Sequence, residues 1–233
     1  MTHVSRDTAA GSPPMFRARA LDVFTRVPWW IVPIVWAPIL AGLAWSCRAG
    51  AAAVGAPAWL WPLLPRAGVA LGPALGWASV GLVGWTLAEY LFHRFVFHWV
   101  PATPWGERFH FLAHGVHHRW PDDRWRLVMP PVVSLPLGAG FLTLAAQLLG
   151  DAAAPWFLGF SGGYVVYDLT HYALHHLGGA RRLPRWLVRL RAHHMRHHHL
   201  DGAKGYGVSS PLWDHVFGTA PDRAPVAARG ARG

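Results

Sequence analysis

The chain has a single cysteine and few charged residues, and both shortages restrict what it can be. Cys47 has no second cysteine to pair with among 233 residues, so an intramolecular disulfide and a Cys-x-x-Cys metal motif are both excluded. Charged residues make up 14% of the chain and hydrophobic residues 53%, with 15 tryptophans. This composition is typical of a membrane protein, in which Cys47 would be a small apolar residue of a membrane helix.

Acidic residues are also scarce, and their shortage leaves a formal net charge of +10. Clustered Lys and Arg can indicate nucleic-acid binding. Nineteen of the 21 basic residues, however, fall in segments that four membrane spans would place on one side of a bilayer. The excess is therefore attributed to membrane orientation, and no nucleic-acid partner is expected. The first hydrophobic run has the length of a retained span rather than of a cleaved secretory signal.

Four long hydrophobic runs predict an all-α, integral membrane four-helix bundle with a helical cytosolic cap. Each run has about the twenty residues that cross a bilayer core. The second is rich in Gly and Ala, which favours a central position, and the short Gly150-Asp151 turn predicts a hairpin of the last two. The predicted division is a tail at 1–27, a membrane domain at 28–219 with spans at about 28–47, 67–90, 127–149 and 155–174 and a cap at 91–126 and 175–219, and a disordered tail at 220–233.

This arrangement predicts the orientation of the chain. Four spans place both termini and the cap on the same side, and the positive-inside rule makes that side cytoplasmic. We expect a multi-pass protein of a bacterial inner membrane, or of the endoplasmic reticulum if the source is eukaryotic.

Ten of the 16 histidines fall into four spaced groups, all at the predicted cytoplasmic face. Residues three and four apart are neighbours on a helix surface. In contrast, five residues of an ideal helix rotate by about 140°, so His93 and His98 are expected at a frayed helix end or facing different ions. The ten candidate ligands are His93 and His98; His114, His117 and His118; His171 and His175; and His194, His197 and His198.

Convergence of these ten side chains would require two metal ions, because one ion rarely takes more than six ligands. Neutral imidazole suits iron, zinc and copper. Surface or tag-like histidines are the plain alternative, and four separate groups at one membrane face argue against it. The prediction is geometric: the helix at 114–118 should lie beside the helix at 194–198, over the inner ends of the second and fourth spans.

Three further residues are candidates for orienting the ligands. Glu89 and Asp168 lie in predicted membrane helices, where a carboxylate needs a partner. We expect both to accept hydrogen bonds from ring N–H groups of ligand histidines, with an arginine as an alternative partner for Glu89. His176 lies five positions after His171 and is expected beside the ligands rather than on a metal.

Several motifs resemble the membrane fatty acid hydroxylase superfamily, and within it the fatty acid 2-hydroxylases. They are Glu89-Tyr-x-x-His93-Arg-Phe-x-Phe-His98, His114-Gly-Val-His117-His118 with Pro121 and Asp123, Arg126-Leu-Val-Met-Pro-Pro131, Tyr167-Asp168-x-x-His171-Tyr172-x-Leu174-His175-His176, His194-x-x-His197-His198, and Gly207-Val-Ser-Ser-x-x-Trp213-Asp214-x-Val-Phe-Gly-Thr219. The resemblance covers about residues 60–219.

The resemblance implies a two-iron centre held by the same ten histidines, with O2 as co-substrate and two electrons consumed. Zinc can replace iron in a purified protein of this kind. The implied reaction is hydroxylation of a fatty acyl chain at C2. A fused cytochrome b5 domain, common in eukaryotic members, is not found in this sequence, so a separate electron-donor protein such as cytochrome b5 or a ferredoxin is expected.

Three alternatives stay open from the sequence. Sterol desaturation or hydroxylation and carotenoid ring hydroxylation use the same kind of centre. A non-enzymatic metal transporter or sensor would instead place its ligands along a path through the spans. Zinc hydrolysis is weaker, because catalytic zinc usually has three protein ligands and a water.

Overall fold

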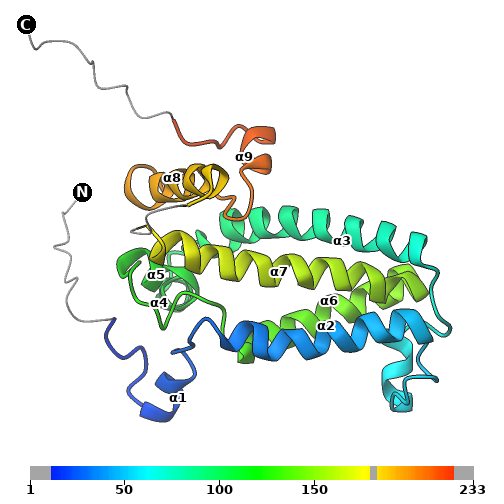
Figure 1. Ribbon diagram of the computed structural model, residues 1–233. Coiled ribbons are helices and arrows are strands. Elements are labelled where there is room, and N and C mark those ends of the chain that lie inside the picture. The colour runs from blue at the N-terminus through cyan, green and yellow to red at the C-terminus, as the bar shows by residue number, and fades with distance from the viewer. Residues whose placement is uncertain (1–11, 179–182, 223–233) are drawn as a thin grey trace, which may run out of the picture.

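Four long helices form the body of the molecule in the computed structural model, which describes residues 12–178 and 183–222 (Figure 1). They are α2 (Ile31–Ala49), α3 (Leu71–Phe92), α6 (Pro131–Leu149) and α7 (Ala153–His176). The described residues contain helices and no strands, so the predicted all-α fold is confirmed. The predicted tails at 1–27 and 220–233 lie outside the described residues at 1–11 and 223–233.

Three helical stretches are long and apolar enough to cross a membrane: Ile31–Ala49, Leu71–Phe97 and Pro131–His176. The third has 46 residues and contains both α6 and α7. The chain reverses between them at Gly150, whose φ of +56° is accessible to glycine without strain. The predicted hairpin therefore lies within this stretch, and α6 and α7 run side by side (Figure 1).

Helix α7 is the centre of the bundle, whereas the sequence predicted that the second span would be. It packs against α2, α3 and α6 and buries residues along most of its length. Glycines bring it close to α3: a Cβ on Gly81 would lie 1.9 Å from the Trp156 carbonyl oxygen, and one on Gly159 would lie 1.8 Å from the Ala78 carbonyl oxygen. These glycines of α3 and α7 thus bring α3 close to α7 alone, rather than to several neighbouring helices.

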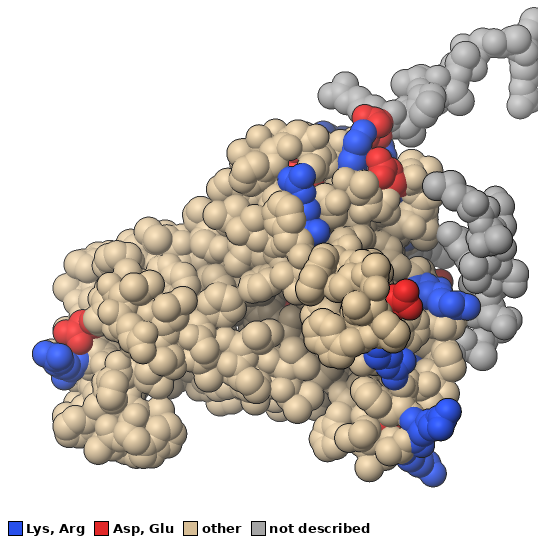
Figure 2. All heavy atoms as spheres, turned by 180° about the vertical axis from the view of Figure 1, so that it is seen from behind, with Lys and Arg blue, Asp and Glu red and all other residues tan. Residues whose placement is uncertain are grey.

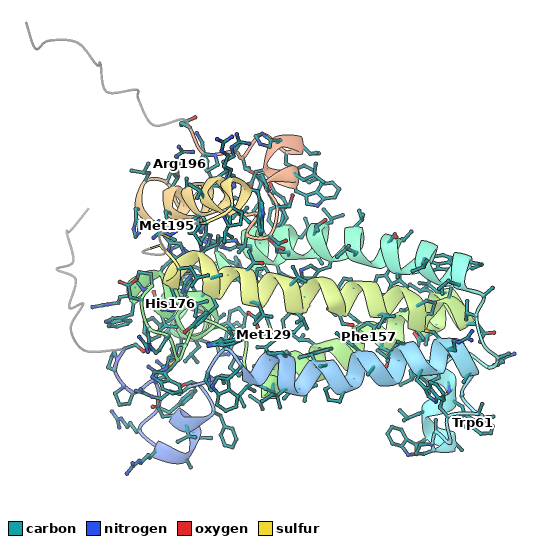
Figure 3. All side chains as sticks on the ribbon, in the orientation of Figure 1. Trp61, Met129, Phe157, His176, Met195 and Arg196 are labelled. Atoms are coloured by element: carbon teal, nitrogen blue, oxygen red, sulfur yellow. The ribbon has the colours of Figure 1, made fainter. Side chains whose placement is uncertain are left out.

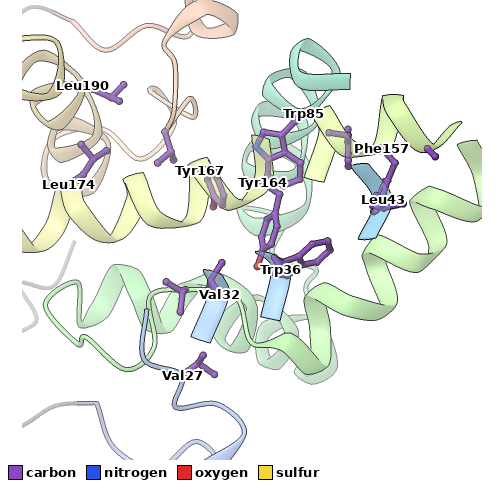
Figure 4. Close-up of a cluster of buried hydrophobic side chains, with 14 of the residues drawn as sticks. Val27, Val32, Trp36, Leu43, Trp85, Phe157, Tyr164, Tyr167, Leu174 and Leu190 are labelled. Atoms are coloured by element: carbon purple, nitrogen blue, oxygen red, sulfur yellow. The ribbon is translucent and has the colours of Figure 1, made fainter. Parts of the chain in front are cut away.

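Aromatic side chains fill the bundle on the side of α7 that faces α2 and α3 (Figure 4). Trp85 meets Tyr164 nearly edge-on with ring centroids 5.4 Å apart, and Trp36 meets Tyr164 at 5.2 Å. Outside the bundle, Leu75 and Val83 are more than half exposed. Because lipid is as apolar as these side chains, close packing rather than removal from water holds such helices together.

The remaining helices gather at one end of the bundle and form the cap (Figure 1). They are α4 (Pro104–His110), α5 (Val116–Arg119), α8 (Arg185–His199) and α9 (Leu212–Val216). A π-helical turn at His93–Phe97 follows α3, and another at Phe111–Gly115 joins α4 to α5. A 3₁₀ helix at Ala58–Leu63 lies at the opposite end, where Trp61 is labelled in Figure 3. Charged side chains lie over the cap and at that opposite tip, and the bundle between them shows none on the face in Figure 2.

Residues 12–27, predicted as a tail, pack against the turn that precedes α6. They include the short helix α1 (Arg19–Val23). Arg126 Nη2 donates to Asp22 Oδ1 at 2.9 Å, and the Ser12 amide donates to Asp123 Oδ2 at 3.2 Å. All four of these residues are buried. The partners lie more than 100 residues apart in the chain, so the local polar composition of the segment gives no sign of the contact.

Candidate metal centre

The ten spaced histidines converge into two groups of five where the cap meets the bundle. Within each group the candidate ligand nitrogen atoms all lie within 4.8 Å of one another. The first group is His93, His98, His114, His118 and His197, and the second group is His117, His171, His175, His194 and His198. The structure thus brings together every histidine that the spacing selected.

Each histidine triplet is divided between the two groups. His118 Nε2 lies 3.2 Å from His197 Nε2 in the first group, and His117 Nε2 lies 3.0 Å from His198 Nε2 in the second. The helices at 114–118 and 194–198 therefore lie side by side, as predicted. Each helix therefore supplies histidines to both groups. The spacing had predicted only that the three histidines of a helix lie on one face, and did not predict this division.

His93 and His98 belong to the same group, so the alternative in which they face different ions was wrong. They lie just after the end of α3, as the other alternative expected. Their rings lie 5.0 Å apart, because the helix widens into a π-helical turn at His93–Phe97. The His98 amide donates to the His93 carbonyl at 3.3 Å, and this hydrogen bond over five residues defines the wider turn. An ideal α-helix would have turned the two rings apart.

Two backbone carbonyls fix which ring nitrogen carries the proton in two histidines of the first group. His93 Nδ1–H donates to the Tyr206 carbonyl at 2.5 Å, and His197 Nδ1–H donates to the Lys204 carbonyl at 2.8 Å. A carbonyl carries no proton, so both rings hold theirs on Nδ1 and present a lone pair at Nε2. The tautomers of these two histidines follow from their partners.

These lone pairs leave the Nε2 atoms of the first group in conflict unless a cation binds them. His93 Nε2 lies 3.0 Å from His114 Nε2, which lies 2.9 Å from His118 Nε2, which in turn lies 3.2 Å from His197 Nε2. With both ends fixed as acceptors, at least one of the three contacts must join two lone pairs or two N–H groups. A metal ion bound by the Nε2 atoms removes this conflict, so the donor set fits a metal.

The second group has the same converging geometry. His117 Nε2 lies 3.0 Å from His171 Nε2, and His194 Nε2 lies 2.9 Å from His175 Nε2 and 3.1 Å from His198 Nε2. The Nδ1 atoms of His194 and His198 are buried and have no hydrogen-bond partner in the part of the chain that the structure describes. Helix packing rather than hydrogen bonding therefore orients these two rings.

Burial keeps the cap histidines in the form that metal binding needs. Burial, followed by the charge of His197, lowers the pKa of His98 to about 4 and that of His118 to about 2. Burial and then His171 lower the pKa of His194 well below its usual value. These imidazoles are neutral near pH 7, and only neutral imidazole can bind a metal through its ring nitrogen.

Glu89 does not accept from a ligand ring, which corrects the prediction for this residue. It accepts from the backbone amides of Val208 at 2.6 Å and Ser209 at 2.8 Å, and from the Ser209 hydroxyl. Two adjacent amides of a turn satisfy the buried carboxylate better than one imidazole would. Glu89 thereby fixes the segment whose Tyr206 carbonyl holds His93.

Asp168 also differs from the prediction. It accepts from the Met129 amide at 3.1 Å and from the Tyr164 hydroxyl at 3.0 Å, rather than from His171. The carboxylate lies on the face of α7 that meets the start of α6, where Met129 offers a free amide ahead of two prolines. Asp168 therefore anchors α6 to α7.

His176 lies in neither group, and its ring is tilted by 42° against that of Tyr172, with ring centroids 4.4 Å apart. A residue that the sequence left as an ordinary surface acid, Asp214, instead supports the centre. It is fully buried, accepts from the amides of Tyr206 at 2.9 Å and Gly207 at 2.8 Å, and contacts His193 Nε2 at 2.9 Å. Its place in the Trp213-Asp214 motif was the available signal.

A cavity of about 710 Å³ opens against both groups and extends into the bundle. His114 of the first group and His117 and His171 of the second line it, and most of its other lining residues are apolar. Residues of the 12–27 segment, Met15 and Phe16 among them, form part of its wall. The cavity has the size and character of sites that bind apolar small molecules.

A bundle of membrane-length helices that ends in two imidazole groups beside an apolar cavity is the architecture of a membrane protein with a site that could hold metal ions next to a lipid-sized space. The family model for fatty acid hydroxylases matches residues 78–219. The chain belongs to the fatty acid hydroxylase family, and the resemblance seen in its motifs is confirmed.

Relatives of known function agree with this placement. The chain is 35% identical to the ceramide very long chain fatty acid hydroxylase scs7 of Schizosaccharomyces pombe, covering 90% of this chain and 55% of the relative. It is 35% identical to the dihydroceramide fatty acyl 2-hydroxylase FAH1 of Arabidopsis thaliana, covering 90% and 80%. It is 35% identical to the human fatty acid 2-hydroxylase, covering 91% and 57%.

A solved structure shares the fold. Full-length scs7p, of which only the hydroxylase domain is visible, superposes with a TM-score of 0.75 at 35% identity, covering 91% of this chain and 74% of that chain. The chain spans slightly more than half the length of the fission yeast and human relatives.

Proposed function

We propose that this protein is a membrane di-iron monooxygenase that hydroxylates a fatty acyl chain at C2, with O2 and two electrons. The observation that carries the proposal is the apolar cavity, whose wall includes histidines of both groups. An apolar chain in this cavity would lie against both metal positions. The names of the Arabidopsis and human relatives support position 2 and a fatty acyl substrate.

The ten histidines would hold two iron ions, five side chains to each. Iron bound there would supply the chemistry by which O2, the oxidant, can react with an unactivated C–H bond. The chain's own residues keep the ligand nitrogens neutral and aimed. The Tyr206 and Lys204 carbonyls orient His93 and His197, and the buried carboxylates of Glu89 and Asp214 hold the segment that carries these carbonyls.

The cavity would position the acyl chain and exclude water from it. Its lining runs from the histidines into the bundle along α6 and α7, so the chain would enter from the bilayer with its polar end near the cap. C2 is one bond from the carbonyl carbon, which places the reacting carbon near the cap end, beside the histidines. An N-acyl sphingolipid is the favoured substrate class, because several relatives are named for ceramide or dihydroceramide.

The electrons would come from a separate protein, such as a cytochrome b5 or a ferredoxin. The cap and both termini would face the cytoplasm, in agreement with the positive-inside bias of the sequence. The membrane would be a bacterial inner membrane, or the endoplasmic reticulum in a eukaryote.

Lipid analysis of an expression host tests the proposal. We expect 2-hydroxy fatty acids, free or in amide linkage, in cells that express the protein together with an electron donor, and two irons per chain after purification in iron-supplemented medium. Zinc-loaded protein should be inactive, since zinc does not change oxidation state. Oxidised sterols or carotenoids without any 2-hydroxy acid would overturn the assignment.

A further inference from the structure

The cavity ends at the same depth on two neighbouring helices. Its lining follows one face of α7 from His171 to Phe157 and one face of α6 from Val132 to Phe141. Along α7 this interval is 14 residues (171 minus 157), or roughly 21 Å of helix. Both Met129 and Phe157 line the cavity, and Figure 3 shows Met129 near the cap and Phe157 farther along the bundle.

Beyond that depth, α6 and α7 bury alanines. Ala145 follows Phe141 by one turn, and Ala153 and Ala154 precede Phe157 by one turn; all three alanines are buried and none lines the cavity. Small side chains let helices approach closely in a membrane. The cavity lining therefore ends before the turn that α6 and α7 share.

Aromatic rings form the end of the cavity. Phe141 lies 4.9 Å from Phe160 on α7 and 6.0 Å from Phe92 on α3, measured between ring centroids. Phe141 thus links the two helices that flank this part of the cavity, and its own side chain is only partly buried.

Trp36 of α2 lies beside Gly138 of α6 and completes this part of the cavity wall. A Cβ added to Gly138 would lie 2.7 Å from Trp36 Cη2 and 3.5 Å from Phe157 Cζ, so the indole occupies the space that glycine leaves. The Trp36 indole N–H donates to the Ser134 hydroxyl at 3.3 Å, which holds the ring in this position (Figure 4).

We propose that Phe141, together with Trp36 and Phe157, is an end wall that sets the longest acyl chain the protein accepts. This inference rests on the proposed acyl-chain function and specifies which part of the site selects the substrate. A chain whose C2 lies beside the histidines extends down the cavity until its methyl end meets these rings. A longer chain finds no lining residues beyond these rings on α6 or α7, so the cavity gives it no further room.

Three variants in the full-length membrane protein test the end wall. Phe141→Ala removes a ring from the wall and should shift the product distribution toward chains longer by roughly two to four carbons. Ser161→Leu adds a side chain one turn nearer the cap, where Ser161 lines the cavity, and should shift the distribution toward shorter chains. Leu144→Ala is the matched control, since Leu144 lies one turn beyond Phe141 on α6, is 51% exposed and does not line the cavity.

Two measurements separate this inference from the proposed function. The first is the chain-length profile of hydroxylated lipids, and the second is the profile of acyl lipids that co-purify with the protein, which requires no turnover. Opposite shifts in Phe141→Ala and Ser161→Leu support the end wall even if the hydroxylated product proves to be another compound. Unchanged co-purified and product profiles in Phe141→Ala, with the protein folded and lipid-loaded, would overturn it.

Discussion

The two histidine groups are built alike but are held in place differently. In the first group, the Nδ1 atoms of His93 and His197 donate to backbone carbonyls of the 204–206 segment. In the second group, the Nδ1 atoms of His194 and His198 are buried without a partner among the described residues. Two rings of the first group are thus oriented by hydrogen bonds to a loop, and two rings of the second group by the packing of helices.

The loop that serves the first group is itself tied to two helices, one distant in the chain and one nearby. Glu89 on α3 binds its Val208 and Ser209 amides, and Asp214 on α9 binds its Tyr206 and Gly207 amides. Ligand orientation in the first group therefore depends on the bundle and the cap at once. This difference between the groups can be tested by breaking each support separately.

The largest effect is expected from His117→Ala. His117 lies within 3.0 Å of His171 and His198 through its Nε2 atom, so its loss should empty the second group of metal and abolish product, while the protein stays in the membrane. Lipid mass spectrometry and metal analysis measure both effects. His215→Ala, at an exposed histidine outside both groups, is the control. Retained activity in His117→Ala would remove this residue from the ligands.

A smaller but selective effect is expected from Glu89→Ala. Without the carboxylate, the 206–209 segment loses its tie to α3, and loss of such supporting contacts typically lowers activity or metal affinity by about 10- to 100-fold. Metal content should fall from two ions per chain toward one, with the second group retained. Glu89→Gln should be milder, since its amide oxygen can still accept from both backbone amides. Equal loss from both groups would contradict the division of support.

Metal removal should show the same contrast in the unmodified protein. Because two rings of the second group lack a partner at Nδ1, a chelator should withdraw its ion first, giving two phases of metal loss. Quantifying metal against time of dialysis measures this. In Glu89→Ala the two phases should merge or exchange order, and a single phase in the parent protein would count against the comparison.

The smallest effect is expected from Lys204→Ala. His197 is held by the Lys204 carbonyl, and the Lys204 ammonium pairs with Asp222 at 2.7 Å on the surface. Exposed ion pairs contribute little, so hydroxylation should stay within about twofold of the parent. A large loss of activity would show that the side chain, and not the backbone, positions this ligand.

The membrane helices could be predicted because their signal is local. An uncharged run of about twenty residues identifies α2, and the Gly150-Asp151 turn identifies the hairpin of α6 and α7. Which helix lies at the centre was not local information. It depends on which glycines meet a neighbour, and only the packed structure shows that Gly81 and Gly159 both serve the contact of α3 with α7.

The candidate ligands could be predicted for a similar reason, since spacing places histidines near one another on a helix. The supporting contacts could not, because they join residues far apart in the chain. Glu89 lies 119 positions from Val208, and Asp22 lies 104 from Arg126. The carbonyls that orient His93 and His197 are backbone groups, which every residue possesses, so no residue type marks them.

The π-helical turn at His93–Phe97 makes the first group sensitive to the number of residues in this turn as well as to their identity. Inserting one residue between His93 and His98 would rotate His98 by about 100° about the helix axis and turn its ring away from His93. The neighbouring aromatic residues could be exchanged with far less disturbance to the ligands. Length variation among homologues should therefore be excluded from this five-residue turn even where side chains vary.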